Sequence, residues 1–248
     1  MSELDYAKVE EVLVDWLREK VAAAGARGAV VGLSGGIDSS VTSVLCKKAF
    51  GDQVLGVIMP CYSNEQDAED ARLVAETFGI DYITRDLSSV LDEFLVVLEG
   101  SKEKEEDNLA LANMKPRLRM ITLYYYAAKK NYLVVGTDNW SELKVGYFTK
   151  YGDGGIDIAP LGRLVKNEVR ELAKHLKIPE RIINKSPSAG LWHGQTDEDE
   201  MGISYETLDK YILTGEADPE EKERIKELAR KSAHKLAPIP IPDRESLL

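Results

Sequence analysis

The stretch between residues 30 and 40 constrains the fold more than any other part of this chain. It passes from Val30 and Val31 into a turn of small residues, Gly32-Leu33-Ser34-Gly35-Gly36-Ile37-Asp38-Ser39, and then into a predicted helix. The paired glycines allow backbone angles closed to other residues and let a ligand approach the main chain. Serine hydroxyls and the unpaired N–H groups of the following helix then form an anion site suited to phosphate or pyrophosphate.

The loop is not a Walker A motif, because no Gly-Lys-Ser/Thr sequence closes it. Asp38 stands where a P-loop has its lysine, and a carboxylate beside phosphates indicates a metal ion. The plainer interpretation is a tight strand-to-helix turn with incidental serines. A lone Gly-Gly would leave both interpretations open, whereas the complete Ser-Gly-Gly-x-Asp-Ser pattern favours the anion site.

Apolar periodicity predicts short strands that alternate with helices along the 248 residues. Strands are expected at 29–33, 53–59, 80–84 and 132–136. Helices are expected at 4–24, 41–50, 64–78, 88–98, 108–130, 165–176, 205–213 and 219–236, with a kink or restart at Pro116. An acidic surface segment is expected at about 99–107, long irregular stretches at 140–159 and 186–202, and a proline-rich tail at 238–248.

This order predicts an α/β fold of the Rossmann-like kind, a three-layer parallel sheet with helices on both faces. No repeat or long linker divides the chain, so residues 1–248 are expected to form a single domain. Ligands of such folds lie beyond the carboxyl ends of the strands. The loops after the first, second and fourth strands should therefore meet at one cleft.

Composition limits the class of partner. A net charge of −11 and a pI near 4.9 argue against nucleic-acid binding. Cys46 and Cys61 form neither a disulfide framework nor a zinc motif. The sequence shows no signal peptide and no apolar run long enough for a membrane span, so a cytoplasmic protein is expected.

A second acidic residue follows the fourth predicted strand. Thr137 offers a hydroxyl at the strand end, and Glu142 lies about one helical turn later. Magnesium takes carboxylates together with phosphate oxygens, so Asp38 and Glu142 could hold one Mg²⁺ against a triphosphate. The alternative is that Glu142 is a solvated residue at a helix start.

The serine-glycine loop and several later segments resemble the motifs of known enzymes. The loop Ser34–Ser39 resembles the pyrophosphate loop of the N-type ATP pyrophosphatases, whose fold is called adenine nucleotide α-hydrolase-like. Four further segments resemble NAD synthetases in order and spacing. They are Arg117-Leu118-Arg119-Met120, Phe148-Thr149-Lys150-Tyr151-Gly152-Asp153-Gly154-Gly155, the segment 187–198 (Pro-Ser-Ala-Gly-Leu-Trp-His-Gly-Gln-Thr-Asp-Glu), and His234-Lys235.

The resemblance implies a reaction and a set of roles. ATP would adenylate the nicotinate carboxylate of deamido-NAD with release of pyrophosphate, and ammonia would displace AMP to give NAD. The implied ATP-binding residues are Gly32, Leu33, Ser34, Gly35, Gly36, Ile37, Asp38, Ser39, Thr137, Lys166 and Ser188. Asp38 and Glu142 would hold Mg²⁺, and Arg117, Lys150, Asp157, His234 and Lys235 would contact deamido-NAD. Asp38, Asp157 and Lys166 are the expected catalytic residues, with Asp157 as a candidate to orient or deprotonate ammonium.

Several alternatives remain open. On sequence alone Lys166 would be an ordinary surface lysine, and His234 an ordinary surface or packing histidine. Trp140 stands where the family commonly has a small or basic residue, and it could either pack under the loop or stack on a ring of the nucleotide. The apolar surface at Tyr124–Tyr126 and Leu95–Leu98 suggests a homodimer, or else packing within the subunit.

The sequence also bears on the source of nitrogen and on which other classes of protein the chain could belong to. A glutamine-dependent synthetase would need an attached amidase domain with a catalytic cysteine, so free ammonia is the predicted donor. The rival classes are a GMP synthetase subunit, a tRNA thiolase with reactive cysteines and a basic surface, and a non-catalytic adenine-nucleotide sensor on the same fold.

Overall fold

Strand β1 (Ala29–Gly32) lies inside a four-stranded parallel sheet with the order β3–β2–β1–β4 in the computed structural model, which describes residues 4–103, 108–187 and 196–247. Its neighbours are β2 (Val54–Ile58) and β4 (Leu133–Val134), and β3 (Tyr82–Thr84) is the far edge. Ala29 pairs with Val54 on one side and Leu133 on the other. The four predicted strands and their parallel arrangement are confirmed.

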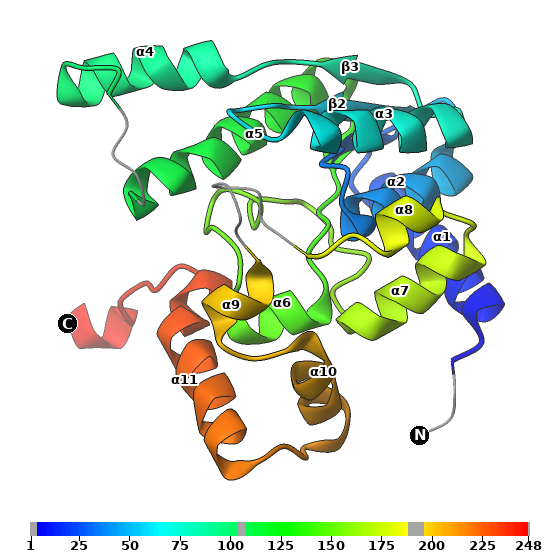
Figure 1. Cartoon of the computed structure of the whole chain (residues 1–248). Helices are drawn as coiled ribbons and strands as arrows, with labels where there is room; N and C mark the ends of the chain where they lie inside the picture. Colours follow the sequence, from blue (N-terminus) through cyan, green and yellow to red (C-terminus); the bar gives the residue numbers. More distant parts are fainter. Residues whose placement is uncertain (1–3, 104–107, 188–195, 248) are drawn as a thin grey trace.

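Alternate residues of β1 point to opposite faces of the sheet, as the strand period requires. Ala29 and Val31 join an apolar core with α1 (Tyr6–Ala23), α2 (Ile37–Phe50), α3 (Glu65–Phe78) and α7 (Lys166–His175). Val30 joins a second core with α4 (Ser88–Glu99) and α5 (Leu109–Lys130). Helices therefore cover both faces, as Figure 1 shows, and the predicted three layers are confirmed.

A third apolar cluster lies among short helices in the second half of the chain. α6 (Trp140–Val145), α9 (Asp197–Met201), α10 (Tyr205–Thr214) and α11 (Pro219–Leu236) pack around the fully buried side chains of Tyr205, Leu208 and Ile225. Figure 1 places these helices beside α7 rather than over the sheet. The chain ends in a 3₁₀ turn at Arg244–Leu247, and α8 (Glu180–Ile183) follows α7.

Two of the predicted irregular stretches are partly wrong. The stretch 140–159 begins with α6, and the described end of 186–202 contains α9. Helices of six and five residues are too short to show a helical period, so their signal is only their caps. Asn139 and Glu142 form a capping box at the start of α6, which the Asn-x-x-Glu spacing could have indicated.

Helix ends follow local chemistry elsewhere. The predicted cap Asn64 accepts a hydrogen bond from the N–H of Gln66 at 3.0 Å, and Gly79 ends α3 in the left-handed region. α5 runs without interruption through Pro116. α2 starts at Ile37 rather than at residue 41, which places Asp38 and Ser39 in its first turn. No helix in the described parts of the chain is both long and apolar enough to cross a membrane.

Gly35 is the one loop residue that nothing larger can replace without movement. It has a φ of +76°, and a Cβ at this position would lie 2.3 Å from the carbonyl oxygen of Asp67 in α3. The loop after β1 therefore packs directly against the first turns of α3, and this contact fixes the path of the backbone.

We predict that Gly35→Ala lowers the free energy of unfolding by about 2–4 kcal/mol, because it adds a backbone collision to the left-handed strain of about 1–2 kcal/mol. Urea unfolding measures this. Gly79→Ala is the matched control, since Gly79 has a φ of +63° and open space around its Cβ position. Equal losses in the two variants would show that the contact with α3 is unimportant.

Candidate functional site

The site lies where the connections of the sheet change direction. From β1 the chain continues to β2 and β3 on one side, whereas β4 joins the other side of β1. The loops that follow β1 and β4 therefore leave from adjacent strand ends, which is where α/β sheets bind ligands. Asp38 follows β1 and Glu142 follows β4.

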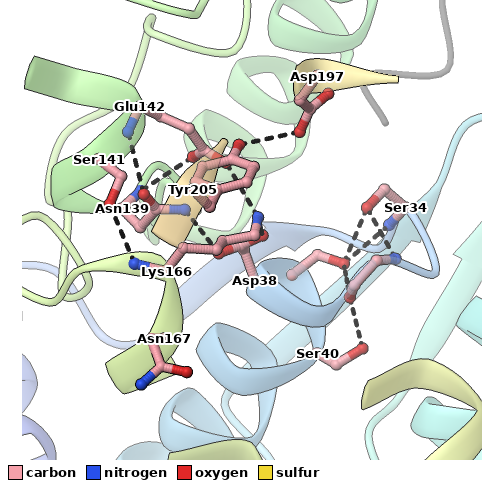
Figure 2. A network of polar contacts seen from close by, with 12 residues as sticks. Ser34, Asp38, Ser40, Asn139, Ser141, Glu142, Lys166, Asn167, Asp197 and Tyr205 are labelled. Carbon is pink, nitrogen blue, oxygen red and sulfur yellow. Dashed lines mark hydrogen bonds and ion pairs between the residues drawn. The ribbon is translucent and has the colours of Figure 1, made fainter. Parts of the chain in front are cut away.

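A buried lysine joins these two carboxylates. The Nζ of Lys166, at the start of α7, lies 2.6 Å from Oδ2 of Asp38 and 3.2 Å from Oε1 of Glu142. Lys166 is 2% exposed. Figure 2 shows the three side chains converging from α2, α6 and α7. The structure thus brings together the predicted metal-binding pair and a predicted catalytic lysine.

Asn139 holds both carboxylates in place. Its side-chain oxygen accepts from the N–H of Glu142, and its Nδ2 donates to Oδ1 of Asp38 at 3.0 Å. The N–H of Asn139 donates to the other oxygen of Glu142 at 3.1 Å. Asn139 is completely buried. The Asn-x-x-Glu capping pattern of this residue is visible in the sequence, but its contact with Asp38, 101 positions away, is not.

Buried polar contacts also anchor the start of α7. The hydroxyl of Ser141 donates to Asp209 in α10 at 2.5 Å and accepts from the N–H of Lys166 at 3.0 Å. The N–H of Asn167 donates to the other oxygen of Asp209 at 2.8 Å. These contacts tie α6, α7 and α10 together directly behind Lys166. No local sequence signal pointed to Asp209.

Tyr205 covers the opposite side of Lys166. The ammonium of Lys166 lies 4.9 Å from the centre of the Tyr205 ring, a distance at which a cation interacts with an aromatic face. The Tyr205 hydroxyl is 3.0 Å from Asp197 and 3.3 Å from Glu142, and can donate to either carboxylate. Tyr205 was missed because the first turn of α10 reads as ordinary core, and Asp197 because the short helix α9 that it begins was not predicted.

Burial governs the titration of this cluster. Burial away from water raises the pKa of Glu142 to about 7. The positive charge of Lys166 lowers this pKa and the negative charge of Asp38 raises it, but burial is the largest effect. Burial alone would lower the pKa of Lys166, but Asp38 and Glu142 outweigh it and raise that pKa. The lysine therefore stays charged and acts as the counter-ion of both carboxylates.

The predicted anion loop is pre-organised by its own serines. The Ser34 and Ser39 hydroxyl oxygens lie 2.9 Å apart, and the N–H of Gly36 donates to the Ser34 hydroxyl at 3.2 Å. The Ser40 hydroxyl donates to the Gly36 carbonyl at 2.7 Å. The loop leads straight into α2, so the positive end of the helix dipole faces it.

Positive side chains offset two aspartates behind this loop. The Nζ of Lys185 lies 2.7 Å from Asp67 and 2.8 Å from Asp70, and Arg181 is 2.7 Å from Asp70. The backbone carbonyl of Asp67 and the Cβ of Asp70 lie beside Gly35, so without these positive partners the two negative charges would weaken an anion site at this loop. Thr137 follows β4 as expected, and the predicted contact Ser188 lies outside the described residues.

A second group of predicted residues gathers around the loop 146–152. The Nζ of Lys150 donates to the carbonyl of His234 at 2.6 Å, and Arg117 donates to the carbonyl of Lys150 at 3.4 Å. Lys235 donates to the carbonyls of Gly146 and Phe148, each at 2.7 Å. Four of the five predicted dinucleotide contacts are thus linked through one loop.

Asp157 has different surroundings. Its Oδ2 accepts from the N–H of Val134 in β4 at 2.8 Å, and its Oδ1 accepts from the hydroxyl of Tyr124 at 3.0 Å. Burial and the neighbouring Asp157 raise the pKa of Tyr124 to about 12, so the tyrosine remains a donor. Both oxygens of Asp157 therefore serve to join β4 to α5 in this structure.

The carboxylates of Asp38 and Glu142 could hold a hard divalent cation. Lys166 already stands between them as a positive charge, which shows that both oxygens face one point. The described residues contain no group of three or more His, Cys, Asp or Glu side chains that could hold a metal ion. Two carboxylates are nevertheless sufficient when phosphate oxygens complete the coordination shell of magnesium.

Comparison with known proteins gives a consistent assignment. A family model described as NAD synthase matches residues 9–239. The NH(3)-dependent NAD(+) synthetase of Carboxydothermus hydrogenoformans is 53% identical over 232 residues, covering 94% of this chain and 96% of that protein.

Two solved structures have a similar fold over nearly the whole chain. The NMN synthetase of Francisella tularensis matches with a TM-score of 0.92 and 38% identity, covering 97% of this chain and all of that one (100%). An NH3-dependent NAD synthetase from Campylobacter jejuni matches with a TM-score of 0.79 and 36% identity, with the same coverage of 97% and 100%.

The raised pKa of Glu142 predicts a pH dependence of stability. In the folded protein the Glu142 carboxyl keeps its proton up to about pH 7, whereas in the unfolded chain it loses the proton near pH 4.5. The folded state therefore binds more protons between these values, and the free energy of unfolding falls as the pH rises through this window. We expect Glu142→Gln to remove this fall, about 1–3 kcal/mol, in urea unfolding of the metal-free protein at a series of pH values.

Glu206→Gln, on the exposed surface of α10, is the control and should keep the wild-type pH dependence. Identical pH profiles for Glu142→Gln and the wild type would contradict the assignment of the raised pKa to Glu142.

Proposed function

Because the chain belongs to the NAD synthase family, we propose that it is an ammonia-dependent NAD synthetase, which uses ATP and ammonia to convert deamido-NAD into NAD. ATP adenylates the nicotinate carboxylate and pyrophosphate leaves. Ammonia then displaces AMP from the NAD-adenylate. The observation that carries this proposal is the Asp38–Lys166–Glu142 cluster beside the serine-glycine loop.

Adenylation joins two anions, so positive charge must be placed before the chemistry begins. We assign the loop from Gly32 to Ser39 to the ATP phosphates, with Thr137 and Ser188 completing the nucleotide site. Lys166 is held rigidly by Asp38, Glu142 and the contacts of its backbone, so its ammonium can neutralise phosphate charge without first becoming ordered.

Magnesium fits this site. Asp38 and Glu142 would hold it, and it would neutralise the triphosphate and make pyrophosphate a better leaving group. Asn139 fixes an oxygen of each carboxylate independently of any ligand. This pre-organisation supports a role for both carboxylates in binding rather than in proton transfer.

The second substrate requires a separate set of positive groups. Arg117, Lys150, His234 and Lys235 meet around the loop 146–152, and we assign them to deamido-NAD together with Asp157. Burial lowers the pKa of Lys235, which makes its charge costly unless an anion lies nearby. A dinucleotide pyrophosphate is such an anion.

The rival classes fit less well. A tRNA thiolase needs reactive thiols, but Cys46 and Cys61 are both buried and form no disulfide, and burial raises the pKa of Cys46. A nucleotide sensor would not need paired carboxylates around a buried lysine. One specific observation favours a second substrate, nicotinate mononucleotide, because the structural neighbour with the TM-score of 0.92 is named an NMN synthetase.

The reaction can be tested with the purified chain. We expect ATP-dependent formation of NAD from deamido-NAD with ammonium, and little product when glutamine replaces ammonium. Amidation of nicotinate mononucleotide should be slower. Chromatography of the products measures all three rates. Asp38→Asn should lower the rate at least about a hundredfold, because the phosphate charge loses a stabilising group. Efficient use of glutamine, or faster turnover of the mononucleotide, would contradict the proposed donor or substrate.

We also propose that the chain forms a homodimer through α4 and α5. Val97 and Leu98 in α4 are 80% and 58% exposed, and Ile121 and Tyr125 in α5 are each 59% exposed. Part of the surface considered from the sequence packs inside the subunit instead, since Leu95 is buried and Tyr124 bonds to Asp157. The remaining apolar face is larger than single scattered residues and favours a self-complementary contact.

Val97→Lys should convert the dimer to a monomer in sedimentation velocity, because a charge would be buried at the contact. Val12→Lys is the matched control, since Val12 is also exposed (51%) but lies on α1. A monomeric wild type, or a dimer that survives Val97→Lys, would contradict this interface.

A further inference from the structure

Arg119 is a partly buried arginine of α5 that the roles assigned above do not use. Its Nε donates to the carbonyl of Met59 at 3.2 Å, and its Nη2 donates to the hydroxyl of Ser63 at 3.2 Å. Both acceptors are uncharged, whereas a guanidinium removed from water is more commonly paired with a carboxylate. The cost of placing a charge here therefore asks for a reason other than an ion pair.

The two acceptors of Arg119 lie where strands β1 and β2 part. Successive carbonyls of a strand point to alternate neighbours. The Val57 carbonyl accepts from the Leu33 N–H on the β1 side, and the Ile58 carbonyl accepts from the residue that follows β3. The Met59 carbonyl therefore faces the β1 side again, where the chain has already turned into the serine-glycine loop. Arg119 supplies the donor that β1 no longer offers.

The loop that follows β2 has a conformation that its sequence does not favour. Tyr62 has a φ of +53°, and a bulky residue adopts this left-handed region only where tertiary contacts impose it. The N–H of Tyr62 donates to the Ser88 hydroxyl in α4 at 3.1 Å. The Ser63 hydroxyl accepts from the Cys61 N–H at 3.3 Å as well as from Arg119. Contacts from α4 and α5 thus hold this loop from two sides.

The position of Met59 bears directly on the anion loop. Its Cε lies 3.4 Å from the point that a Cβ on Gly32 would occupy, so the Met59 side chain covers the residue at which the predicted ATP loop begins. Two residues earlier on α5, Arg117 donates to the carbonyl of Lys150. α5 therefore supports the nucleotide end of the cleft through Arg119 and the loop assigned to deamido-NAD through Arg117.

We propose that Arg119 is a positioning residue for ATP, an assignment that rests on the proposed function. Its guanidinium holds the end of β2 and the following loop in the shape that places Met59 over Gly32 before the nucleotide arrives. Such pre-organisation lowers the cost of ordering the site on binding. The contribution of Arg119 therefore belongs to the binding of ATP, and neither to the transfer step nor to the binding of deamido-NAD.

Steady-state kinetics of NAD formation test this role. Arg119→Met keeps a long side chain but removes its donors, and should raise the KM for ATP about tenfold to a hundredfold, because two charge-assisted hydrogen bonds are lost. The kcat and the KM for deamido-NAD should stay within about threefold of the wild type. Arg119→Lys keeps the charge and can replace one of the donors, so it should recover part of the lost affinity.

Arg85→Met is the matched control. Arg85 also donates to one hydroxyl and one carbonyl at a strand end, from its Nε to Tyr126 at 2.8 Å and from its Nη1 to Thr84 at 2.7 Å. It is exposed, however, and follows β3, which is not adjacent to β1. Its removal should leave both KM values unchanged. An equal rise in the KM for ATP would show that any such contact at a strand end has this effect, and would overturn the assignment.

Ser63→Ala tests the same contact without removing a charge, and it decides the matter if Arg119→Met does not fold. It should raise the KM for ATP about twofold to fivefold, because one hydrogen bond is lost. In the double variant it should add little to the effect of Arg119→Met, since the two side chains act through one contact.

Three results contradict the role of Arg119. A lower kcat with an unchanged KM for ATP in Arg119→Met would make the residue merely structural. A larger rise in the KM for deamido-NAD would place it with Arg117 instead. An unchanged KM for ATP in Ser63→Ala would exclude the contact with the loop. If the wild type makes no NAD, the proposed function fails, and calorimetric ATP binding by the wild type and Arg119→Met then decides the role of Arg119.

Discussion

The buried ion pair of Lys166 with Asp38 and Glu142 is the interaction on which the site depends. Removing three charges from water is costly, and the cost is met only because each charge has a close partner and further hydrogen bonds. Loss of one partner from such a cluster typically costs about 3–5 kcal/mol. The cluster also joins α2, α6 and α7, so the same contacts that prepare the chemistry connect the sheet to the helices beside it.

The surrounding structure explains how this arrangement is tolerated. Asn139 satisfies an oxygen of each carboxylate, and Ser141 and Asp209 hold the backbone from which Lys166 projects. The Tyr205 ring excludes water from one side while its face attracts the ammonium. Negative charge still exceeds positive charge in the site.

Local patterns were reliable where the physical cause was local. The strands, the Asn64 cap, the Gly79 helix end and the serine-glycine loop all depend on a few neighbouring residues, and the structure agrees with each. The short helices α6 and α9 were missed because a helical period needs more residues than they contain. Asp209 and Tyr205 were missed because their contacts with Ser141 and Glu142 join positions more than 60 residues apart in the sequence.

The sequence by itself determined the fold class and the tight strand-to-helix turn of the serine-glycine loop, for which anion binding remains a prediction. Both follow from turn geometry, apolar periodicity and residue types that act over short distances. Only the tertiary structure decided that Lys166 is buried between Asp38 and Glu142. It also decided that Arg117 and Lys235 contact the loop that contains Lys150. The hydrogen bonds from Val134 and Tyr124 to Asp157 are likewise visible only in the folded chain. Charges and partners in a low-dielectric interior depend on which distant segments meet, and no local pattern in the sequence carries that information.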